Sequence, residues 1–344
     1  MAPPKELVVA VIGYTGGVGT CLLKAMEKIQ LKPFALVRSS TMKFVKDGED
    51  GSELPLDYQV LGQRLLAHSQ ATSGIPVIAD VTASPAVQAQ YHQWLTSGIS
   101  VVAANKGIFA GPEANYQALL DACQTSPARL FHETTVGAGL PVLGTLQALK
   151  ASSHDIVQVE GVLSGTLAFV LGQVAGGKQK LSDAVKKAKE LGYTEPDPRD
   201  DLNGMDVARK AVILGRLAGL KGVELQDMEI ESLVPESLRE CTVEEFLDKL
   251  SDYDDAMAER VAKVEATPGC RLHYAAKVDV KAGKVGVGLL ACEASHPFNN
   301  AGPDNLVAIT TNYYTRPLVI QGAGAGGDVT ATGVLADILL CAYN

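Results

Sequence analysis

A strand, a glycine turn and a helix follow one another near the start of the chain, and this order constrains the fold most. A β-branched run at residues 6–12 leads into Gly-Tyr-Thr-Gly-Gly-Val-Gly at 13–19 and then into an amphipathic segment at 20–29. Glycines let a backbone approach a pyrophosphate, and a helix N-terminus supplies amide donors. The spacing G-x-x-G-x-x-G differs from the usual G-x-G-x-x-G. The prediction of a dinucleotide site therefore rests on the order of the elements. The candidate contacts in this turn are Gly13, Thr15, Gly16, Gly17, Val18 and Gly19.

The second predicted strand, residues 33–40, has Arg38 near its end. NAD sites usually place Asp or Glu there to bind the ribose 2′-hydroxyl, whereas a guanidinium suits the 2′-phosphate of NADP. The alternative is an exposed arginine without a cofactor role. We predict NADP(H) as the preferred cofactor with NAD(H) possible.

Three further apolar strands are predicted at residues 75–81, 99–104 and 128–131, separated by helical segments at 85–96 and 112–123. Alternation of this kind predicts a parallel sheet with right-handed crossovers, in which ligands bind beyond the carboxyl ends of the strands. We therefore expect one edge of the sheet to carry Gly13, Thr82, Lys106 and Glu133. For Lys106, a solvated loop lysine is the alternative.

Length and composition favour a soluble two-domain enzyme. The chain has 344 residues, and domains average ~150 residues. Its net charge of −9 argues against a nucleic-acid binder, and polar residues interrupt both long apolar stretches, 161–177 and 318–343. No signal peptide is evident, so we expect a cytoplasmic protein with six reduced cysteines, an organelle after loss of a targeting segment being the alternative.

The stretch 191–210 is the strongest candidate for a catalytic segment. Pro196 and Pro198 exclude a regular helix from its first part, and a helix is expected after Gly204 as far as residue 218. Asp206 and Lys210 are four residues apart and project from one face of that helix. An acidic loop would thus deliver Glu195 beside a carboxylate and an amine, which suits a small zwitterion and a proton transfer. A surface loop followed by an exposed ion pair is the alternative.

The second half predicts a mixed domain. Helices are expected at 142–150, at 183–191, and at 243–263 with a break near Ser251. Strands are expected at 157–162, 271–280, 284–292, 306–312 and 316–320, and the short connection at 281–283 predicts a hairpin of 271–280 with 284–292. A last helix, 329–342, should return to the first domain. The predicted fold class is α/β, with a Rossmann-type parallel sheet domain (1–141 plus 326–344) and a second α+β catalytic and dimerisation domain (142–325).

Over nearly its whole length the chain resembles homoserine dehydrogenase, in the monofunctional form without an appended regulatory domain. The resemblance rests on residues 105–106, 132–141, 164–166, 189–198, 200–210 and 321–326. It implies NAD(P)-dependent interconversion of L-aspartate 4-semialdehyde and L-homoserine, a step toward threonine, methionine and isoleucine. Because no sensor domain follows Asn344, feedback inhibition by threonine through such a domain is not expected.

The resemblance also implies roles for single residues. Lys210 matches the proton donor and acceptor, and Lys106 a second active-site lysine. Substrate-binding positions match Asp206, Glu195, Thr166 and Tyr193, cofactor-binding positions match Thr82, Lys106, Gly192 and Gly326, and the carbonyls of Glu133, Val136, Ala138 and Leu140 match a structural sodium site. A homodimer through residues 271–320 is implied as well. The chain departs from the family at Gly17, at Arg38 and at Gly327-Asp328.

Three other functions compete with this one. An acylating semialdehyde dehydrogenase would need an activated cysteine, and no cysteine stands in an evident nucleophile motif. A non-catalytic NADP-binding sensor would bind the dinucleotide without turnover. A metal hydrolase built on Asp197, Asp200, Asp201 and Asp206 is the weakest, because no histidine accompanies these carboxylates.

Overall fold

The computed structural model describes residues 6–46 and 51–343 and divides into two compact units. One unit comprises Met1–Leu143 and Ala325–Asn344, and the other comprises Gly144–Gly324. None of the helices in the described part of the chain has the length and apolar character that a membrane span needs.

The first unit contains a seven-stranded sheet in the order β4-β3-β2-β1-β5-β6-β7. Its strands are β1 (Leu7–Ile12), β2 (Ala35–Val37), β3 (Thr41–Phe44), β4 (Leu54–Pro55), β5 (Ile75–Asp80), β6 (Ser100–Ala103) and β7 (Leu130–Phe131). The five strands predicted from the sequence are parallel, as expected. The sequence analysis missed β3 and β4, which extend the sheet beyond β2 as an antiparallel edge.

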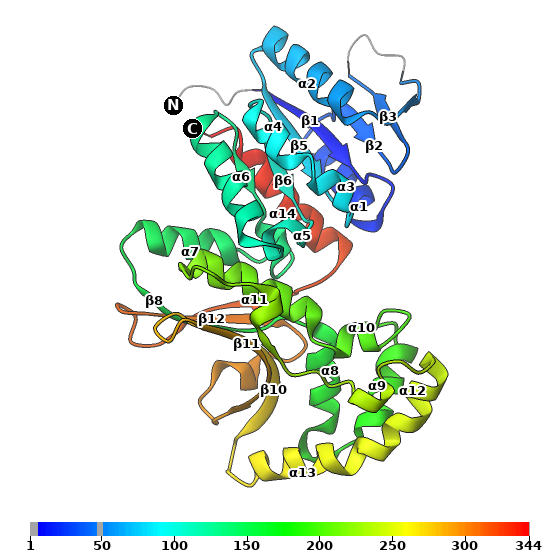
Figure 1. The fold of residues 1–344 in the computed structure, drawn as a ribbon, viewed down its shortest axis with the longest axis vertical. Coiled ribbons are helices and arrows are strands. Elements are labelled where there is room, and N and C mark those ends of the chain that lie inside the picture. Colours follow the sequence, from blue (N-terminus) through cyan, green and yellow to red (C-terminus); the bar gives the residue numbers. More distant parts are fainter. Residues whose placement is uncertain (1–5, 47–50, 344) are drawn as a thin grey trace. The chain divides into compact units, whose positions relative to one another are not determined.

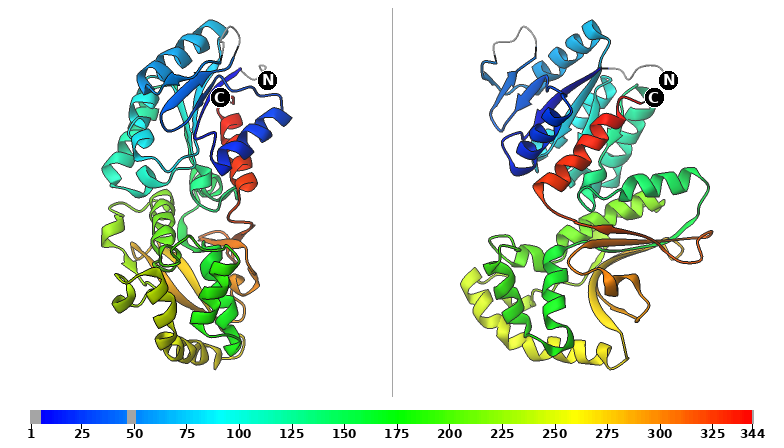
Figure 2. Two further views of the ribbon diagram at one scale, coloured as in Figure 1. Left: turned by 90° about the vertical axis from the view of Figure 1, so that its right-hand side faces the viewer. Right: turned by 180° about the vertical axis from the view of Figure 1, so that it is seen from behind.

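Helices cover both faces of this sheet (Figure 2), with α1 and α14 on one face and α2, α4 and α6 on the other. Their bounds are α1 (Gly17–Lys28), α2 (Tyr58–Thr72), α3 (Pro85–Gln88), α4 (Tyr91–Thr96), α5 (Gly107–Ala110), α6 (Glu113–Thr125), the 3₁₀ turn η1 (Glu133–Thr135) and α14 (Gly327–Leu340). Helix α14 lies in this unit because Val334 and Ile338 are buried in the same apolar core as Leu22 and Met26 of α1. The single helix expected at 85–96 is instead the pair α3 and α4.

The second unit contains a six-stranded sheet in the order β13-β12-β8-β10-β11-β9. Its strands are β8 (Ile156–Val162), β9 (Glu229–Ile230), β10 (Arg271–Asp279), β11 (Lys284–Cys292), β12 (Asn305–Thr311) and β13 (Leu318–Gly322). The predicted hairpin is confirmed, with Arg271 opposite Cys292 and Asp279 opposite Lys284. The short strand β9, which the sequence analysis missed, pairs with β11 in parallel.

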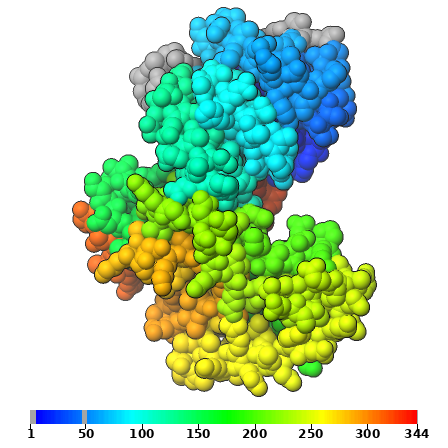
Figure 3. Space-filling model, in the orientation of Figure 1, coloured from blue at the N-terminus to red at the C-terminus, as the bar shows by residue number. Residues whose placement is uncertain are grey.

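Helix α11 packs on this sheet, and α8, α9, α12 and α13 form a helical lobe beside it (Figure 1). The helices are α7 (Val142–Ala151), α8 (Gly165–Val174), η2 (Ala175–Gly177), α9 (Leu181–Glu190), α10 (Arg199–Leu202), α11 (Met205–Ala218), η3 (Leu225–Asp227), η4 (Glu236–Leu238), α12 (Val243–Lys249), η5 (Leu250–Tyr253), α13 (Asp254–Glu265) and η6 (Pro297–Asn300). The predicted break between α12 and α13 is confirmed by η5, and these two helices form the yellow surface of the lobe in the space-filling view (Figure 3).

Helix α11 begins at a glycine that no other residue can replace without strain. Gly204 adopts φ of +77°, and a Cβ atom placed on it would lie 2.0 Å from the hydroxyl oxygen of Tyr274. That hydroxyl donates a hydrogen bond to the carbonyl of Glu231 at 2.6 Å. The start of α11 is therefore fixed against β10 by close contact.

We predict that Gly204→Ala lowers the free energy of unfolding by about 3 kcal/mol, since the left-handed backbone costs ~1–2 kcal/mol and displacement of Tyr274 adds to it. Gly283→Ala is the matched control, because Gly283 has φ of +68° but no neighbouring atom within 4 Å of its Cβ position. Urea unfolding of both variants measures the difference. An equal loss of unfolding free energy in the two variants would show that the contact with Tyr274 does not contribute to stability.

His132 is a buried histidine in the first unit whose protonation should govern stability in acid. Its ring stacks on Phe109 at 4.1 Å between centroids, and burial lowers its pKa to about 4. In the unfolded chain a histidine titrates near pH ~6.5. The folded state therefore favours neutral His132, and this contribution is complete above pH ~6.5 and is lost as the pH falls toward the folded pKa.

We predict that the first unit loses about 3 kcal/mol of stability between pH 6.5 and 4 through His132 alone. His132→Gln should flatten this part of the pH dependence, whereas His92→Gln, at an exposed position, should leave it unchanged. Urea unfolding at a series of pH values tests both variants. A profile for His132→Gln as steep as that of the wild type would refute the assignment.

Candidate active site

The glycine turn packs directly on the start of α1. Gly13 has φ of +91° and donates its amide to the carbonyl of Val37 at 2.8 Å. A Cβ atom on Gly19 would lie 2.2 Å from the carbonyl oxygen of Gly13, so only glycine allows this close approach. Helix α1 begins at Gly17, earlier than predicted, and Gly16 provides no side-chain cap. The first amides of α1 are thus left for another acceptor, such as a phosphate.

Two other predicted cofactor residues lie beside this turn. A Cβ atom on Gly13 would lie 2.7 Å from Cγ2 of Thr82, which follows β5. Gly326 is exposed with φ of +117° and immediately precedes α14, whose first residue Gly327 lies against the backbone of Gly17. The fold therefore brings Thr82 and Gly326 to the glycine turn, whereas Gly192 belongs to the second unit, where it follows α9 with φ of +72°.

A buried polar network lies beneath Thr82 and Lys106. The carboxylate of Asp80 is fully buried and accepts hydrogen bonds from the hydroxyl of Tyr91 at 2.5 Å, the amide of Thr82 at 2.8 Å and the side chain of Asn105 at 3.2 Å. Burial raises the pKa values of both Asp80 and Tyr91. The network joins the loop after β5 to the loop after β6, and it therefore positions Lys106, the N-cap residue that precedes α5.

This network was not predicted from the sequence. One signal was available, namely an acidic residue at the end of an otherwise apolar strand. Only the fold shows that α4 directs Tyr91 at that carboxylate.

Arg38 follows β2, and its guanidinium already has partners. Its Nε donates to the hydroxyl of Thr41 at 2.7 Å, and its terminal nitrogen forms an ion pair with Glu53. The predicted contact with a 2′-phosphate would therefore have to compete with a carboxylate.

The predicted sodium ligands share one turn of the first unit. Gly137 and Ala138 have φ of +79° and +53°, and the carbonyl of Leu140 accepts the amide of Val142 at 2.8 Å. Asp337 of α14 accepts the amide of Glu133 at 3.0 Å, and burial raises the pKa of Asp337 to about 7. Within residues 6–46 and 51–343, no group of three or more His, Cys, Asp and Glu side chains could bind a metal ion, so carbonyl oxygens would have to supply such a site.

In the second unit, the predicted proton donor Lys210 of α11 is a buried charged residue. Its side chain is only 11% exposed, and its ammonium contacts Oδ2 of Asp206 at 2.7 Å and donates to the carbonyl of Leu163 at 2.6 Å. The alternative of an exposed surface ion pair is thus wrong for Lys210. A buried ammonium needs such partners, because removal of a charge from water is costly.

The acidic loop converges on Asp201, which the sequence analysis did not single out as a substrate residue. The hydroxyl of Thr166 donates to the carbonyl of Tyr193 at 2.5 Å and lies 3.1 Å from Oδ1 of Asp201. The other oxygen of Asp201 accepts the amide of Glu195 at 2.8 Å, and burial raises the pKa of Asp201. Three predicted substrate residues are therefore connected, while the Tyr193 ring is half exposed against Phe169.

Arg199 anchors the other end of this loop. Its guanidinium pairs with Asp197 at 2.7 Å and donates to the carbonyls of Leu238, Arg239 and Cys241 at 3.2, 3.0 and 2.6 Å. Hydrogen bonding from Arg199 lowers the pKa of Asp197. The loop also contains the short helix α10, which corrects the expectation of irregular structure up to Gly204.

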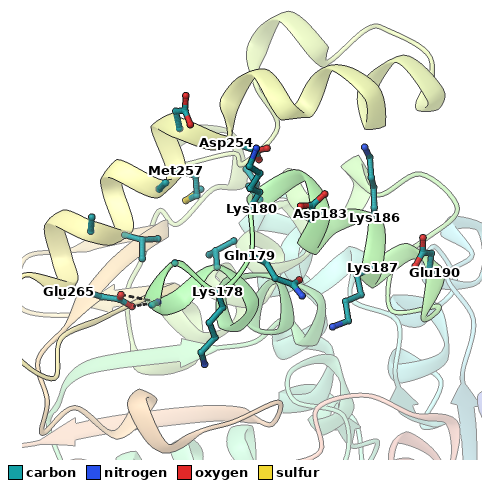
Figure 4. A pocket seen from close by; sticks show the side chains of 18 residues that line it. Lys178, Gln179, Lys180, Asp183, Lys186, Lys187, Glu190, Asp254, Met257 and Glu265 are labelled. Carbon is teal, nitrogen blue, oxygen red and sulfur yellow. Dashed lines mark hydrogen bonds between the residues drawn. The ribbon is translucent and has the colours of Figure 1, made fainter.

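A separate cavity of about 990 Å³ lies between α9 and α13 in the helical lobe (Figure 4). Its labelled side chains include Lys180, Lys187, Asp254 and Glu265, so both charge signs are present. The lining contains none of the predicted substrate residues of this unit. The cavity is therefore separate from the predicted substrate residues of the acidic loop.

Comparisons with known proteins agree with this arrangement. The family model for homoserine dehydrogenase matches residues 141–339, and that for the homoserine dehydrogenase NAD-binding domain matches residues 14–133. The chain belongs to the homoserine dehydrogenase family. The homoserine dehydrogenase of Saccharomyces cerevisiae is 40% identical over 85% of this chain and 80% of that protein.

A bifunctional aspartokinase/homoserine dehydrogenase of Zea mays is 40% identical over 92% of this chain, which spans only 35% of that longer protein. Among solved structures, a Candida auris protein of unknown function superposes with a TM-score of 0.92 and 35% identity over 99% of both chains. A hyperthermophilic archaeal homoserine dehydrogenase mutant in complex with NADPH has a TM-score of 0.73 at 24% identity, over 97% of this chain and 96% of that one, which shows the shared fold.

These comparisons confirm several predictions made from the sequence. They confirm the resemblance to homoserine dehydrogenase and the Rossmann-type domain with a second α+β domain. They also confirm an NAD(P)-binding domain and the class of NAD(P)-dependent oxidoreductases that act on a CH–OH group. The roles of single residues remain predictions.

We predict that Asp201→Asn lowers kcat/KM for the aldehyde substrate about 100-fold, because a shifted Glu195 and Thr166 would misplace the substrate. The dissociation constant for NADPH should not change, since the contacts of Asp201 are with Thr166 and the Glu195 amide, and neither residue is a predicted cofactor contact. Asp200→Asn is the matched control at the exposed neighbouring carboxylate. Equal losses in both variants, or weaker NADPH binding, would contradict this role.

Proposed function

We propose that this chain interconverts L-aspartate 4-semialdehyde and L-homoserine with NADP(H) as the preferred cofactor, in the biosynthesis of threonine, methionine and isoleucine. The observation that carries the proposal is the buried ammonium of Lys210, held by Asp206 and the carbonyl of Leu163. We assign residues 1–141 and 326–344 to cofactor binding and residues 142–325 to catalysis and dimerisation.

Lys210 provides the proton in this proposal. The bound nicotinamide supplies or accepts the hydride. During reduction, negative charge grows on the aldehyde oxygen, and the Lys210 ammonium stabilises this charge and donates its proton. During oxidation the neutral amine removes the hydroxyl proton. Asp206 and the Leu163 carbonyl keep the amine in one orientation, which limits the entropy lost in each turnover.

The remaining charges suit an amino-acid substrate. Glu195 is exposed and the side chain of Asp206 is 46% exposed, so both carboxylates can accept hydrogen bonds from the substrate ammonium. Asp201 holds the Glu195 backbone in place. Thr166 and Tyr193 are assigned to substrate binding, and Lys106 is assigned the role of a second active-site lysine. No carboxylate has to be protonated for this recognition.

For the cofactor, the uncapped start of α1 offers amides to the pyrophosphate. Thr15, Gly16, Gly17 and Val18 lie at this end of the helix, with Gly13, Gly19, Thr82 and Gly326 packed beside it. Arg38 favours the 2′-phosphate of NADP, and Gly192 and Lys106 are assigned to the nicotinamide side.

We further propose a structural sodium ion, a homodimer and a cytoplasmic or organellar location. Carbonyl oxygens are preferred ligands of hard cations, and the left-handed turn at Gly137 and Ala138 exposes several of them within a few residues. The carbonyls assigned to sodium are those of Glu133, Val136, Ala138 and Leu140. The antiparallel strands β10 to β13 are the assigned dimerisation region.

The thiols weigh against an acylating dehydrogenase, which needs a thiolate nucleophile. A hydrogen bond to Asp328 raises the pKa of Cys21, and burial raises that of Cys123. Burial also raises the pKa values of Cys292 and Cys341 to about 12. These four thiols are therefore less easily ionised than an ordinary cysteine.

We predict that Lys210→Ala lowers kcat about 1,000-fold in both directions, because the proton donor is lost. Binding of NADPH should be retained. The measurement is NADPH oxidation with L-aspartate 4-semialdehyde and NADP⁺ reduction with L-homoserine. Lys249→Ala is the matched control, since Lys249 forms an i,i+4 pair with Glu245 at 3.9 Å but is 54% exposed.

Near-normal turnover of Lys210→Ala would remove Lys210 from the mechanism. A wild-type protein that binds NADPH but turns over neither substrate would instead support the non-catalytic sensor.

A further inference from the structure

Three side chains meet at the end of β2, where a Rossmann-type domain distinguishes NADP from NAD. The Arg38 guanidinium donates from Nε to the Thr41 hydroxyl at 2.7 Å and pairs through its terminal nitrogen with Glu53. Thr41 also lies 3.5 Å from the Glu53 carboxylate. Arg38, which suits the 2′-phosphate of NADP, and Glu53, which suits the ribose 2′-hydroxyl of NAD, are therefore in contact at this position.

The antiparallel edge of the sheet produces this meeting. Val37 of β2 pairs with Met42 of β3, and Thr41 of β3 pairs with Pro55 of β4. Glu53 immediately precedes β4, so the edge returns it to Arg38 although the two residues are 15 positions apart. The sequence has no acidic residue at the end of β2, where NAD sites usually have one. The fold nevertheless places the Glu53 carboxylate there.

We propose that Glu53 is the ribose-binding carboxylate of this cofactor site, and that exchange of Arg38 between Glu53 and a 2′-phosphate lets the site accept both NADP(H) and NAD(H). This inference rests on the proposed function, in that this edge binds the dinucleotide. It goes further by naming the residue that opposes Arg38 in cofactor choice.

With NADPH, the 2′-phosphate carries close to two negative charges and replaces Glu53 on the terminal nitrogen of Arg38. The bond from Nε to Thr41 can persist, so the guanidinium stays in place during the exchange. Glu53 then remains beside the phosphate as a like charge, which weakens NADPH binding.

With NADH, no exchange is needed. The ribose 2′-hydroxyl donates to the Glu53 carboxylate, which remains paired with Arg38. Both partners are accessible to a ligand, because the side chains of Arg38 and Glu53 are 43% and 44% exposed. Such exposed pairs are held weakly, so either cofactor can engage them.

Lys43 adds a second positive charge to the same face of β3. Thr41 and Lys43 alternate with the buried residues Met42 and Phe44, and the Lys43 amine lies 5.6 Å from the ring centroid of Tyr14 in the glycine turn. Two cations therefore oppose one carboxylate here, which makes NADPH the preferred cofactor and NADH an accepted one.

The test is the pair of dissociation constants for NADPH and NADH, measured calorimetrically without substrate. Glu53→Gln should tighten NADPH binding about fivefold and weaken NADH binding about fivefold. Glu53→Ala should change the ratio of the two dissociation constants in the same direction. Arg38→Ala should weaken NADPH binding and retain NADH binding. Glu27→Gln, which removes one exposed carboxylate from α1, should leave the ratio unchanged.

An unchanged ratio in Glu53→Gln and Glu53→Ala would overturn the inference while leaving the proposed function intact. Weaker NADPH binding in these variants would also overturn it, because Glu53 would then act by orienting Arg38 for the phosphate. A wild-type protein that binds neither nucleotide would refute the proposed function itself.

Discussion

The pairing of the buried Lys210 ammonium with Asp206 and the Leu163 carbonyl is the interaction on which the arrangement of the candidate site in the second unit depends. An ammonium removed from water is stable only when its donors find acceptors, and here Asp206 and the carbonyl of Leu163 provide them. Asp206 lies on α11 itself, one turn before Lys210, while Leu163 follows the end of β8. The position of the Lys210 amine is therefore set jointly by a helix and by the residue after a strand far apart in sequence.

The acidic loop that precedes α11 is held by polar contacts more than by an apolar core. Glycine and proline give the segment few apolar side chains, and its residues between Leu191 and Glu195 are largely exposed. Arg199 fixes one end through three carbonyls, and Asp201 fixes the other through the amide of Glu195. This arrangement leaves the Glu195 side chain exposed while its backbone is held in place.

The cofactor unit follows the same principle at the carboxyl ends of its strands. The buried carboxylate of Asp80 ties the loop of Thr82 to that of Asn105 and Lys106, and the antiparallel edge brings Glu53 to Arg38. The contacts of Asp80 with Asn105 and of Arg38 with Glu53 each join segments that belong to or flank different strands. The surroundings of Lys106 and of Arg38 thus both depend on the order of the strands in the sheet.

The sequence by itself determined the features that arise from local chemistry. It specified the strand–glycine turn–helix at the cofactor end, the i,i+4 relation of Asp206 to Lys210, the β10–β11 hairpin and the family. The tertiary structure alone decided the pairing of residues distant in sequence, such as Tyr91 with Asp80, Arg199 with the carbonyls of 238–241, and Glu53 with Arg38. Local backbone preferences and side-chain periodicity act over a few residues, whereas these contacts exist only after strand order and register bring separate segments together.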